Sequence, residues 1–104
     1  MTPIAVVTTV ASRAEAQTMA HALVERRLAA CVQISEIESV YRWQGQVHQD
    51  PECRLVIKTT RERYAALEQA LRAGHPYELP EIIAVPIERG LPAYLQWVAG
   101  ETQV

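Results

Sequence analysis

The side chains best suited to chemistry gather in one short stretch, HPYELPEI, at residues 75–82. It carries an imidazole at His75, a phenol at Tyr77 and carboxylates at Glu78 and Glu81. Imidazole and carboxylate groups are ligands that divalent cations accept, so His75, Glu78 and Glu81 are candidate metal ligands. The prolines favour a different interpretation, because a residue before proline is held extended, which is what a stiff helix-to-strand connector requires. Taken alone, the stretch leaves both interpretations open.

No recognised catalytic motif occurs elsewhere in the chain. There is no GxSxG nucleophile elbow and no glycine-rich phosphate loop, since the four glycines are far apart. His21 and His48 belong to no local ligand cluster, and we interpret both as solvated side chains. We therefore expect that the protein is not an enzyme.

The two cysteines favour a reducing compartment. Cys31 and Cys53 form neither a CxxC pair nor a zinc-type spacing. Cys31 lies in an apolar context and is predicted to be a core residue, whereas Cys53 is predicted to be half-exposed. Two free thiols fit the cytoplasm better than a disulfide framework does, so we expect a cytoplasmic protein.

Length, charge and hydropathy limit the partners. The 104 residues, 49% of them apolar, fit a single domain over 1–104. A net charge of −2, with acids and bases interspersed, gives no basic surface for nucleic acid. No apolar run approaches the roughly 18 residues of a membrane span, and no basic segment precedes the apolar N-terminal stretch. We expect neither a nucleic-acid partner nor a membrane partner.

The first third of the chain predicts a strand and a helix that could support these side chains. PIAVVTTV, residues 3–10, is short and rich in β-branched residues, as in a buried strand. Ser12 and Glu15 have the spacing of a capping box, in which each side chain hydrogen-bonds the other's backbone N–H. Apolar residues then recur at helical spacing, which predicts a helix to about Leu28.

The middle of the chain, residues 29–60, has no helical period and predicts a long antiparallel hairpin. Gln44 and Gly45 form the predicted turn, since glycine adopts a positive φ freely. Asp50 and Pro51 predict a kink or bulge in the returning strand, because proline has no N–H for the ladder.

The outer part of this hairpin is longer than a small domain needs, so we expect it to overhang its own core. It carries Tyr41 and Trp43 on one face. Exposed aromatic strands tend to aggregate unless another chain covers them. The overhang therefore predicts an oligomer with Tyr41 and Trp43 at its interface.

The last part of the chain predicts a helix, a strand and a short final helix. Thr59 with Glu62 predicts the cap of this helix, and Gly74 is expected to end it by adopting the left-handed backbone conformation. The apolar run at 82–87 predicts a fourth strand, and the segment 92–100 predicts the final helix.

The predicted order is β-α-β-β-α-β plus a terminal helix, which is the split arrangement of a ferredoxin-like α+β domain with an antiparallel sheet. In this layout Lys58, at the end of the third strand, is expected to approach the 75–82 stretch.

Five segments of the chain together match the pattern of a known family, although none would be decisive alone. They are ACVQI at 30–34, SVYRWQGQV at 39–47, LVIKTT at 55–60, HPYELPEIIAVPI at 75–87 and PAYLQWV at 92–98. On these segments the chain resembles the CutA family of divalent-cation tolerance proteins, from about residue 4 to residue 98.

The resemblance implies a ferredoxin-like protomer in a tight homotrimer. In such a trimer the long hairpins extend the sheets across subunit boundaries, which would cover Tyr41 and Trp43. The architecture is similar to that of PII-type signalling proteins, which implies ligand sites in clefts between subunits. The family is associated with tolerance of copper and other divalent metals, and no catalytic mechanism comes with it.

The family's metal ligands are only partly present. They have been tied to a cysteine at the end of the first strand and to histidines around the HPY motif. Here Thr8 and Thr9 stand at the strand end, and Gly74 replaces a second histidine, so only His75 remains. Trimer symmetry would have to add ligands such as Glu78 or Glu81.

Two functions are therefore expected. The first is a trimeric divalent-cation tolerance protein that binds copper or another divalent cation near the clefts between subunits. The alternative is a PII-like module without a direct metal role, which binds a partner or a small anionic ligand. Its cleft would be lined by Lys58, Tyr77, Glu78 and Glu81.

Overall fold

A four-stranded antiparallel sheet organises residues 2–103, the part of the chain that the structure, a computed structural model, describes. The strands are β1 (Pro3–Val10), β2 (Cys31–Trp43), β3 (Gln46–Thr60) and β4 (Ile82–Pro86), in the spatial order β2-β3-β1-β4. The helices are α1 (Arg13–Glu25), α2 (Tyr64–Gly74) and α3 (Pro92–Glu101), and a 3₁₀ turn, η1 (Arg61–Arg63), precedes α2. This confirms the predicted ferredoxin-like order.

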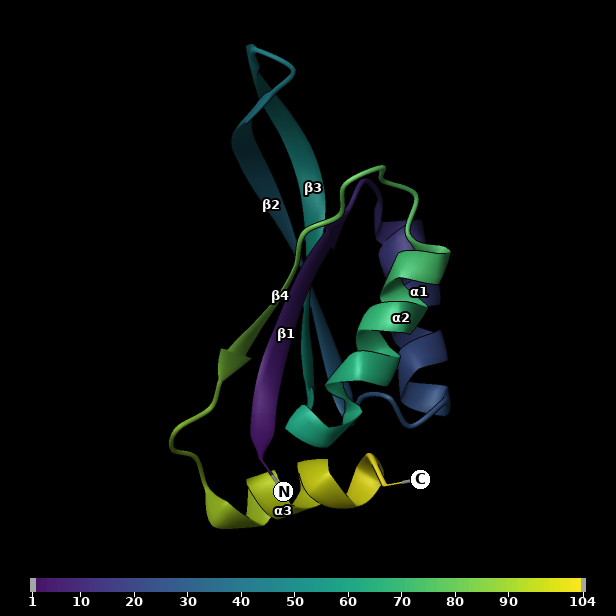
Figure 1. Ribbon diagram of the computed structural model, residues 1–104, viewed down its shortest axis with the longest axis vertical. Helices are drawn as coiled ribbons and strands as arrows, with labels where there is room; N and C mark the ends of the chain where they lie inside the picture. Colours follow the sequence, from purple (N-terminus) through teal and green to yellow (C-terminus); the bar gives the residue numbers. More distant parts are fainter. Residues whose placement is uncertain (1, 104) are drawn as a thin grey trace.

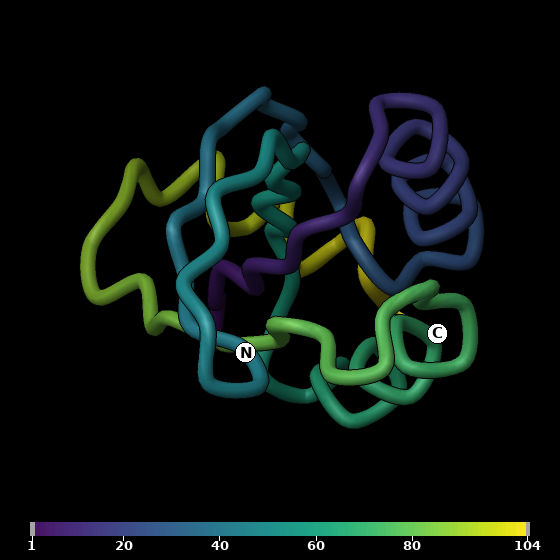
Figure 2. Tube along the Cα trace, turned by 90° about the horizontal axis from the view of Figure 1, so that it is seen from above, coloured from purple at the N-terminus to yellow at the C-terminus, as the bar shows by residue number. Residues whose placement is uncertain are grey.

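One face of the sheet is covered by α1 and α2, as Figures 1 and 2 show. Residues directly opposite each other on neighbouring strands share a face. On this face Val6 lies between Ile57 and Ala84, and Thr8 lies between Leu55 and Ile82. Val6, Ile57, Leu55 and Thr8 are fully buried, so the core lies between the helices and this face.

The opposite face has no helix lying along it. Its central row runs from Gln33 through Val56 and Val7 to Ile83, and Val85 lies in the next row. Ile83 is 50% exposed and Val85 is 47% exposed. The helix α3 crosses the end of the sheet instead of covering this face (Figure 1). We call this side of the sheet the open face; its side chains are Ala5, Val7, Gln33, Val56, Ile83 and Val85.

The hairpin β2-β3 is as long as predicted and extends beyond the rest of the sheet. Its register is unbroken from Cys31 opposite Lys58 to Trp43 opposite Gln46. The predicted turn is confirmed, with φ of 51° at Gln44 and 80° at Gly45. Since β1 pairs with β3 only from Cys53 onward, the outer part of the hairpin has no partner strand beside β3. We call this outer part, residues 37–52, the overhang.

The predicted kink or bulge at Asp50 and Pro51 is wrong. Pro51 lies opposite Glu38 within the unbroken ladder. The carbonyl of Lys58 accepts a hydrogen bond from Ala30, so even-numbered residues of β3 direct their backbone groups toward β2. The nitrogen of Pro51 therefore faces the free side of β3, where no ladder hydrogen bond is lost.

The first helix ends three residues before the predicted Leu28. Arg27 adopts a left-handed φ of 58°, and the N–H groups of Leu28 and Ala29 then donate to the carbonyl of Leu23 at 3.0 and 3.3 Å. Such bonds close a helix end by returning to its last turn. The predicted capping box at its start is confirmed in one half: the Ser12 hydroxyl accepts from the Glu15 N–H. The Glu15 carboxylate accepts from the Ser12 hydroxyl, not from the Ser12 N–H as predicted.

The predicted ends of the later helices are wrong in detail. Thr59 caps no helix, because its hydroxyl donates to the carbonyl of Leu28 at 2.8 Å and fastens the end of α1 to the sheet. Gly74 is the last residue of α2 and does not have a left-handed φ. The final helix continues through Gly100 to Glu101.

The predicted burial of the two cysteines is reversed. Cys53 is buried and faces the helices beside Val10, whereas Cys31 is only half-buried, opposite Lys58. Both thiols are free. Within residues 2–103 no helix is long and apolar enough to cross a membrane.

Candidate functional site

The loop between α2 and β4 passes over the end of β1, and His75 fixes it there. The ring nitrogen Nε2 of His75 lies 2.9 Å from the carbonyl oxygen of Thr9 and 3.2 Å from the hydroxyl of Thr8. The other ring nitrogen, Nδ1, accepts a hydrogen bond of 3.1 Å from the backbone N–H of Tyr77. His75 thus joins three backbone or side-chain groups from two segments far apart in the sequence.

This bonding pattern fixes the protonation state of His75. Nδ1 accepts from an N–H and therefore carries no proton, so the proton lies on Nε2, which donates to Thr9. Burial lowers the pKa of His75 below its ordinary value, and it outweighs the Thr9 carbonyl and the carboxylates of Glu15 and Glu52, which raise it. The imidazole is neutral, and both nitrogens are used.

Tyr77 connects the same loop to the overhang. Its hydroxyl donates to the carboxylate of Glu52 on β3 at 2.7 Å. Its ring lies against the ring of His75, with the centroids 4.9 Å apart and the planes tilted by 53°. Burial, followed by the hydrogen bond to Glu52, raises the pKa of the Tyr77 hydroxyl well above its ordinary value. Tyr77 is therefore a permanent hydrogen-bond donor that holds the overhang to the loop.

The candidate metal ligands do not form a metal site within one protomer. A metal would have to displace a hydrogen bond of His75, because neither nitrogen has a free lone pair. Glu78 and Glu81 are exposed. No three side chains of His, Cys, Asp or Glu within residues 2–103 are grouped closely enough to hold an ion. The residues of a single chain therefore do not fit a bound cation.

Lys58 lies away from this loop, contrary to expectation. It pairs with Ala5, near the start of β1, whereas the loop crosses the other end of that strand. Its ammonium group donates to the side-chain oxygen of Gln33 at 3.3 Å and lies 5.7 Å from the ring centre of Tyr94 on α3. Figure 1 shows α3 and the loop at opposite ends of the sheet. Lys58 and Tyr77 line no common cleft within the protomer.

The aromatic residues of the overhang are ordered by their own strand pair. Tyr41 stacks on His48, with ring centroids 5.3 Å apart, and its hydroxyl donates to Asp50 at 2.7 Å. Tyr41 is nevertheless 43% exposed, and Trp43 at the tip is half-buried. An interface role for Tyr41 and Trp43 stays a prediction at the level of one chain.

Sequence reasoning missed two partners of the loop. The Thr9 carbonyl is a backbone group, so no residue type could indicate it. Glu52 stands next to Pro51 on a strand, and only the three-dimensional path of the loop brings its carboxylate to Tyr77. The sequence contains no signal for either contact.

Comparison with known proteins agrees with the fold. Residues 4–101 match the family model described as CutA1 divalent ion tolerance protein. A divalent-cation tolerance protein CutA from Thermus thermophilus is 48% identical over 98 residues, which cover 93% of this chain and 95% of that protein. The mouse Protein CutA is 46% identical over 89 residues, 85% of this chain, and the chain spans 50% of its length.

Solved structures give the same result. The CutA1 structure from Thermus thermophilus has a TM-score of 0.93 at 46% identity and covers 97% of this chain and 99% of that one. The CutA structure from Synechococcus elongatus has a TM-score of 0.95 at 40% identity and covers 98% of this chain and 91% of that one.

The hydrogen bond of the Tyr77 hydroxyl is predicted to contribute measurably to the free energy of unfolding. We expect Tyr77→Phe to lower the free energy of unfolding by about 1 kcal/mol, because the hydrogen bond to the Glu52 carboxylate is lost. Tyr94→Phe is the control, since the Tyr94 hydroxyl has no hydrogen bond to another residue of 2–103. Chemical denaturation at one protein concentration measures both. Equal stability of the two variants would contradict the role of Tyr77.

The neutral state of His75 predicts a pH dependence. The folded pKa is lowered below the unfolded value of 6.5, so the stabilising effect is full above about pH 6.5 and is lost as the pH falls through the folded pKa. We expect the stability difference between the protein and His75→Gln to be largest near pH 7.5 and to shrink toward pH 5. Denaturation curves across this range measure it, with His21→Gln as the control for loss of an exposed imidazole. A difference that grows on acidification would show that His75 is bound as a cation.

Proposed function

Because the chain belongs to the CutA1 divalent ion tolerance family, we propose that it acts in the tolerance of divalent cations, as a homotrimer and without catalysing a reaction. The family match over residues 4–101 carries this proposal. We place the protein in the cytoplasm because its two thiols are free. One relative, from Arabidopsis thaliana, is named as chloroplastic.

The open face supports a trimer. An apolar surface that no helix of the described residues 2–103 covers is formed by Val7, Val56, Ile83 and Val85. Exposed apolar patches of this kind mark interfaces between proteins. Three copies related by a threefold axis would bury three such faces against one another and leave α1 and α2 outside.

The free strand edges support the same assembly. Among residues 2–103, one side of β3 is unpaired along the overhang, and the outer edges of β2 and β4 have no partner strand. Free edges present unpaired N–H and C=O groups that bind further strands. A neighbouring copy would supply those strands and cover Tyr41 and Trp43.

The metal role is proposed for carboxylates rather than for the histidine. His75 has no free nitrogen, so we assign it to holding the loop in place. Glu78 and Glu81 lie exposed on that loop, and three copies would provide six such carboxylates. Oxygen ligands suit hard divalent cations, whereas copper favours imidazole and thiolate. We therefore propose weak, oxygen-based cation binding and no dedicated copper site.

The alternative function, a small anionic ligand held between Lys58 and Tyr77, has less support. The two side chains lie toward opposite ends of β1 in one protomer, and Lys58 is already bonded to Gln33. This alternative would require the two residues to come from different subunits.

A charge on the open face is predicted to dissociate the trimer. We expect Val85→Asp to shift the protein to monomers in analytical ultracentrifugation, because a carboxylate would be buried without a partner. Val24→Asp is the matched control, since Val24 on α1 is 43% exposed and Val85 is 47% exposed. A trimer that tolerates Val85→Asp would place the interface elsewhere.

Metal titration is predicted to separate the histidine from the carboxylates. With Mn²⁺ in a calorimeter, we expect His75→Ala to keep its affinity for the ion within about twofold. We expect the double variant Glu78→Gln/Glu81→Gln to lose at least roughly tenfold in affinity, because even substitution of groups that only support metal ligands lowers metal affinity by that factor. Glu25→Gln controls for the loss of an exposed carboxylate. Loss of Mn²⁺ binding in His75→Ala alone would show that the histidine is a metal ligand.

A further inference from the structure

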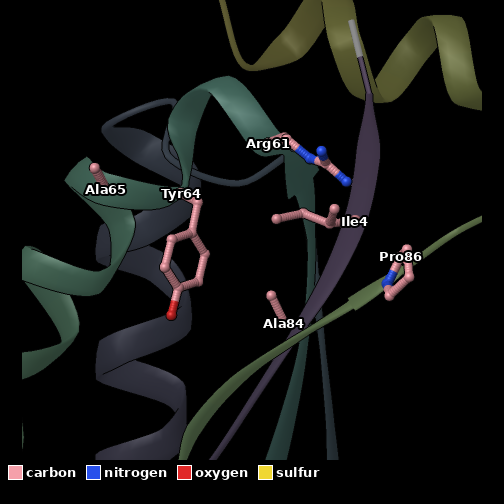
Figure 3. Close-up of a pocket in the computed structure, with 6 residues that line it drawn as sticks. All are labelled: Ile4, Arg61, Tyr64, Ala65, Ala84 and Pro86. Carbon is pink, nitrogen blue, oxygen red and sulfur yellow. The ribbon is translucent and has the colours of Figure 1, made fainter.

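A groove of about 360 Å³ opens on the side of the sheet that carries the helices, between the start of α2 and the edge strand β4. It is lined by Ile4 of β1, Arg61 of η1, Tyr64 and Ala65 of α2, and Ala84 and Pro86 of β4 (Figure 3). Pockets of this size hold small organic ligands. The groove lies on the face opposite to the open face and uses no residue with a proposed metal role. Ala84 and Pro86 belong to β4, whose outer edge is proposed above to bind a neighbouring copy.

The β4 wall of the groove carries a small side chain, Ala84. Ala84 on β4 presents only a methyl group to the space between the strand and the Tyr64 ring, and Ala65 of α2 lies beyond that ring (Figure 3). A larger residue at position 84 would fill part of the space, as close-packed cores usually require.

The interior is apolar. Ile4 forms the floor, and the Tyr64 hydroxyl is turned to Glu68, to which it donates at 3.0 Å. The ring of Tyr64 therefore contributes its hydrocarbon surface to the groove. Such a lining favours a hydrocarbon group of a ligand.

Arg61 adds one positive charge to the apolar lining. Its side chain extends from η1 over Ile4 toward β1 (Figure 3), and its backbone N–H donates to the carbonyl of Thr2 at 2.7 Å, which fixes its position. The salt bridges among residues 2–103 use Arg13 and Arg27, so the Arg61 guanidinium has no carboxylate partner in that range.

Glu62, the acid that follows Arg61 in the sequence, is bound elsewhere. Its carboxylate accepts from the Thr2 N–H at 3.3 Å. Its pKa is lowered chiefly by backbone hydrogen bonds, its own and that of Thr2, and Arg61 is the weakest contributor to this shift. The guanidinium is therefore available to a carboxylate from outside, with which it forms paired hydrogen bonds.

From this combination we propose that the groove binds a small amphipathic monocarboxylate, with its hydrocarbon part between the Tyr64 ring and Ala84 and its carboxylate on Arg61. A neutral molecule of the same length would lack the contact with Arg61, and a purely ionic one would leave the apolar walls exposed to water. The charge and the apolar walls together define the ligand class.

The test uses the whole protein in its assembled state, with sodium octanoate as the probe and 1-octanol as its uncharged counterpart. We expect octanoate to bind, measured by ligand-observed NMR and calorimetry, and Arg61→Gln to weaken it roughly tenfold, the scale of a hydrogen bond to a charged group. Arg72→Gln, at the exposed end of α2, should bind like the wild type. Octanol should bind equally to the wild type and Arg61→Gln.

A second variant tests the groove itself. Ala84→Leu fills the space, and we expect it to abolish octanoate binding without changing the molecular mass in solution; Ala22→Leu on the exposed face of α1 is the matched control. Three results would overturn the proposal. These are no octanoate binding at millimolar concentration, binding unchanged in both groove variants, or a changed mass in Ala84→Leu, which would show that a second copy of the chain occupies the groove.

Discussion

A sheet with two apolar faces and helices for only one of them sets the main constraint on this protein. The strand β1 shows it most clearly: Val6 faces the helices and is fully buried, while its neighbour Val7 points to the open face between Val56 and Ile83. Burial of apolar surface is the chief favourable term in folding and association. The surface that the chain cannot cover by itself is the physical reason to expect further copies.

The same constraint determines the path of the loop after α2. It must carry the chain from the helix layer back to the sheet edge, and it does so over the end of β1. His75 fastens it to the Thr9 carbonyl, and Tyr77 fastens it to Glu52 of the overhang. The contact with Thr9 uses the histidine that first suggested a metal site. The histidine holds the loop on β1, and the proposed cation role is assigned to the exposed carboxylates beside it.

Local signals were sufficient to predict the order of the elements. The strand 3–10 and the turn at Gln44 and Gly45 were predicted at their observed positions, because β-branched runs and glycine turns depend on near neighbours. The wrong predictions concern contacts between residues that are far apart in the sequence. Pro51 is harmless only because β1 ends before reaching it, and Cys53 is buried only because α1 lies over it. Sequence periodicity could not show that Lys58 points toward α3 rather than toward the loop.

The central claim is that the open face is an interface among three copies, and the molecular mass in solution tests it most directly. Light scattering on the purified chain at micromolar concentration should give about 35 kDa, three times the 11.7 kDa chain. A mass near 11.7 kDa would contradict the account, because it would show that Val7, Val56, Ile83 and Val85 remain exposed to water in a stable protein.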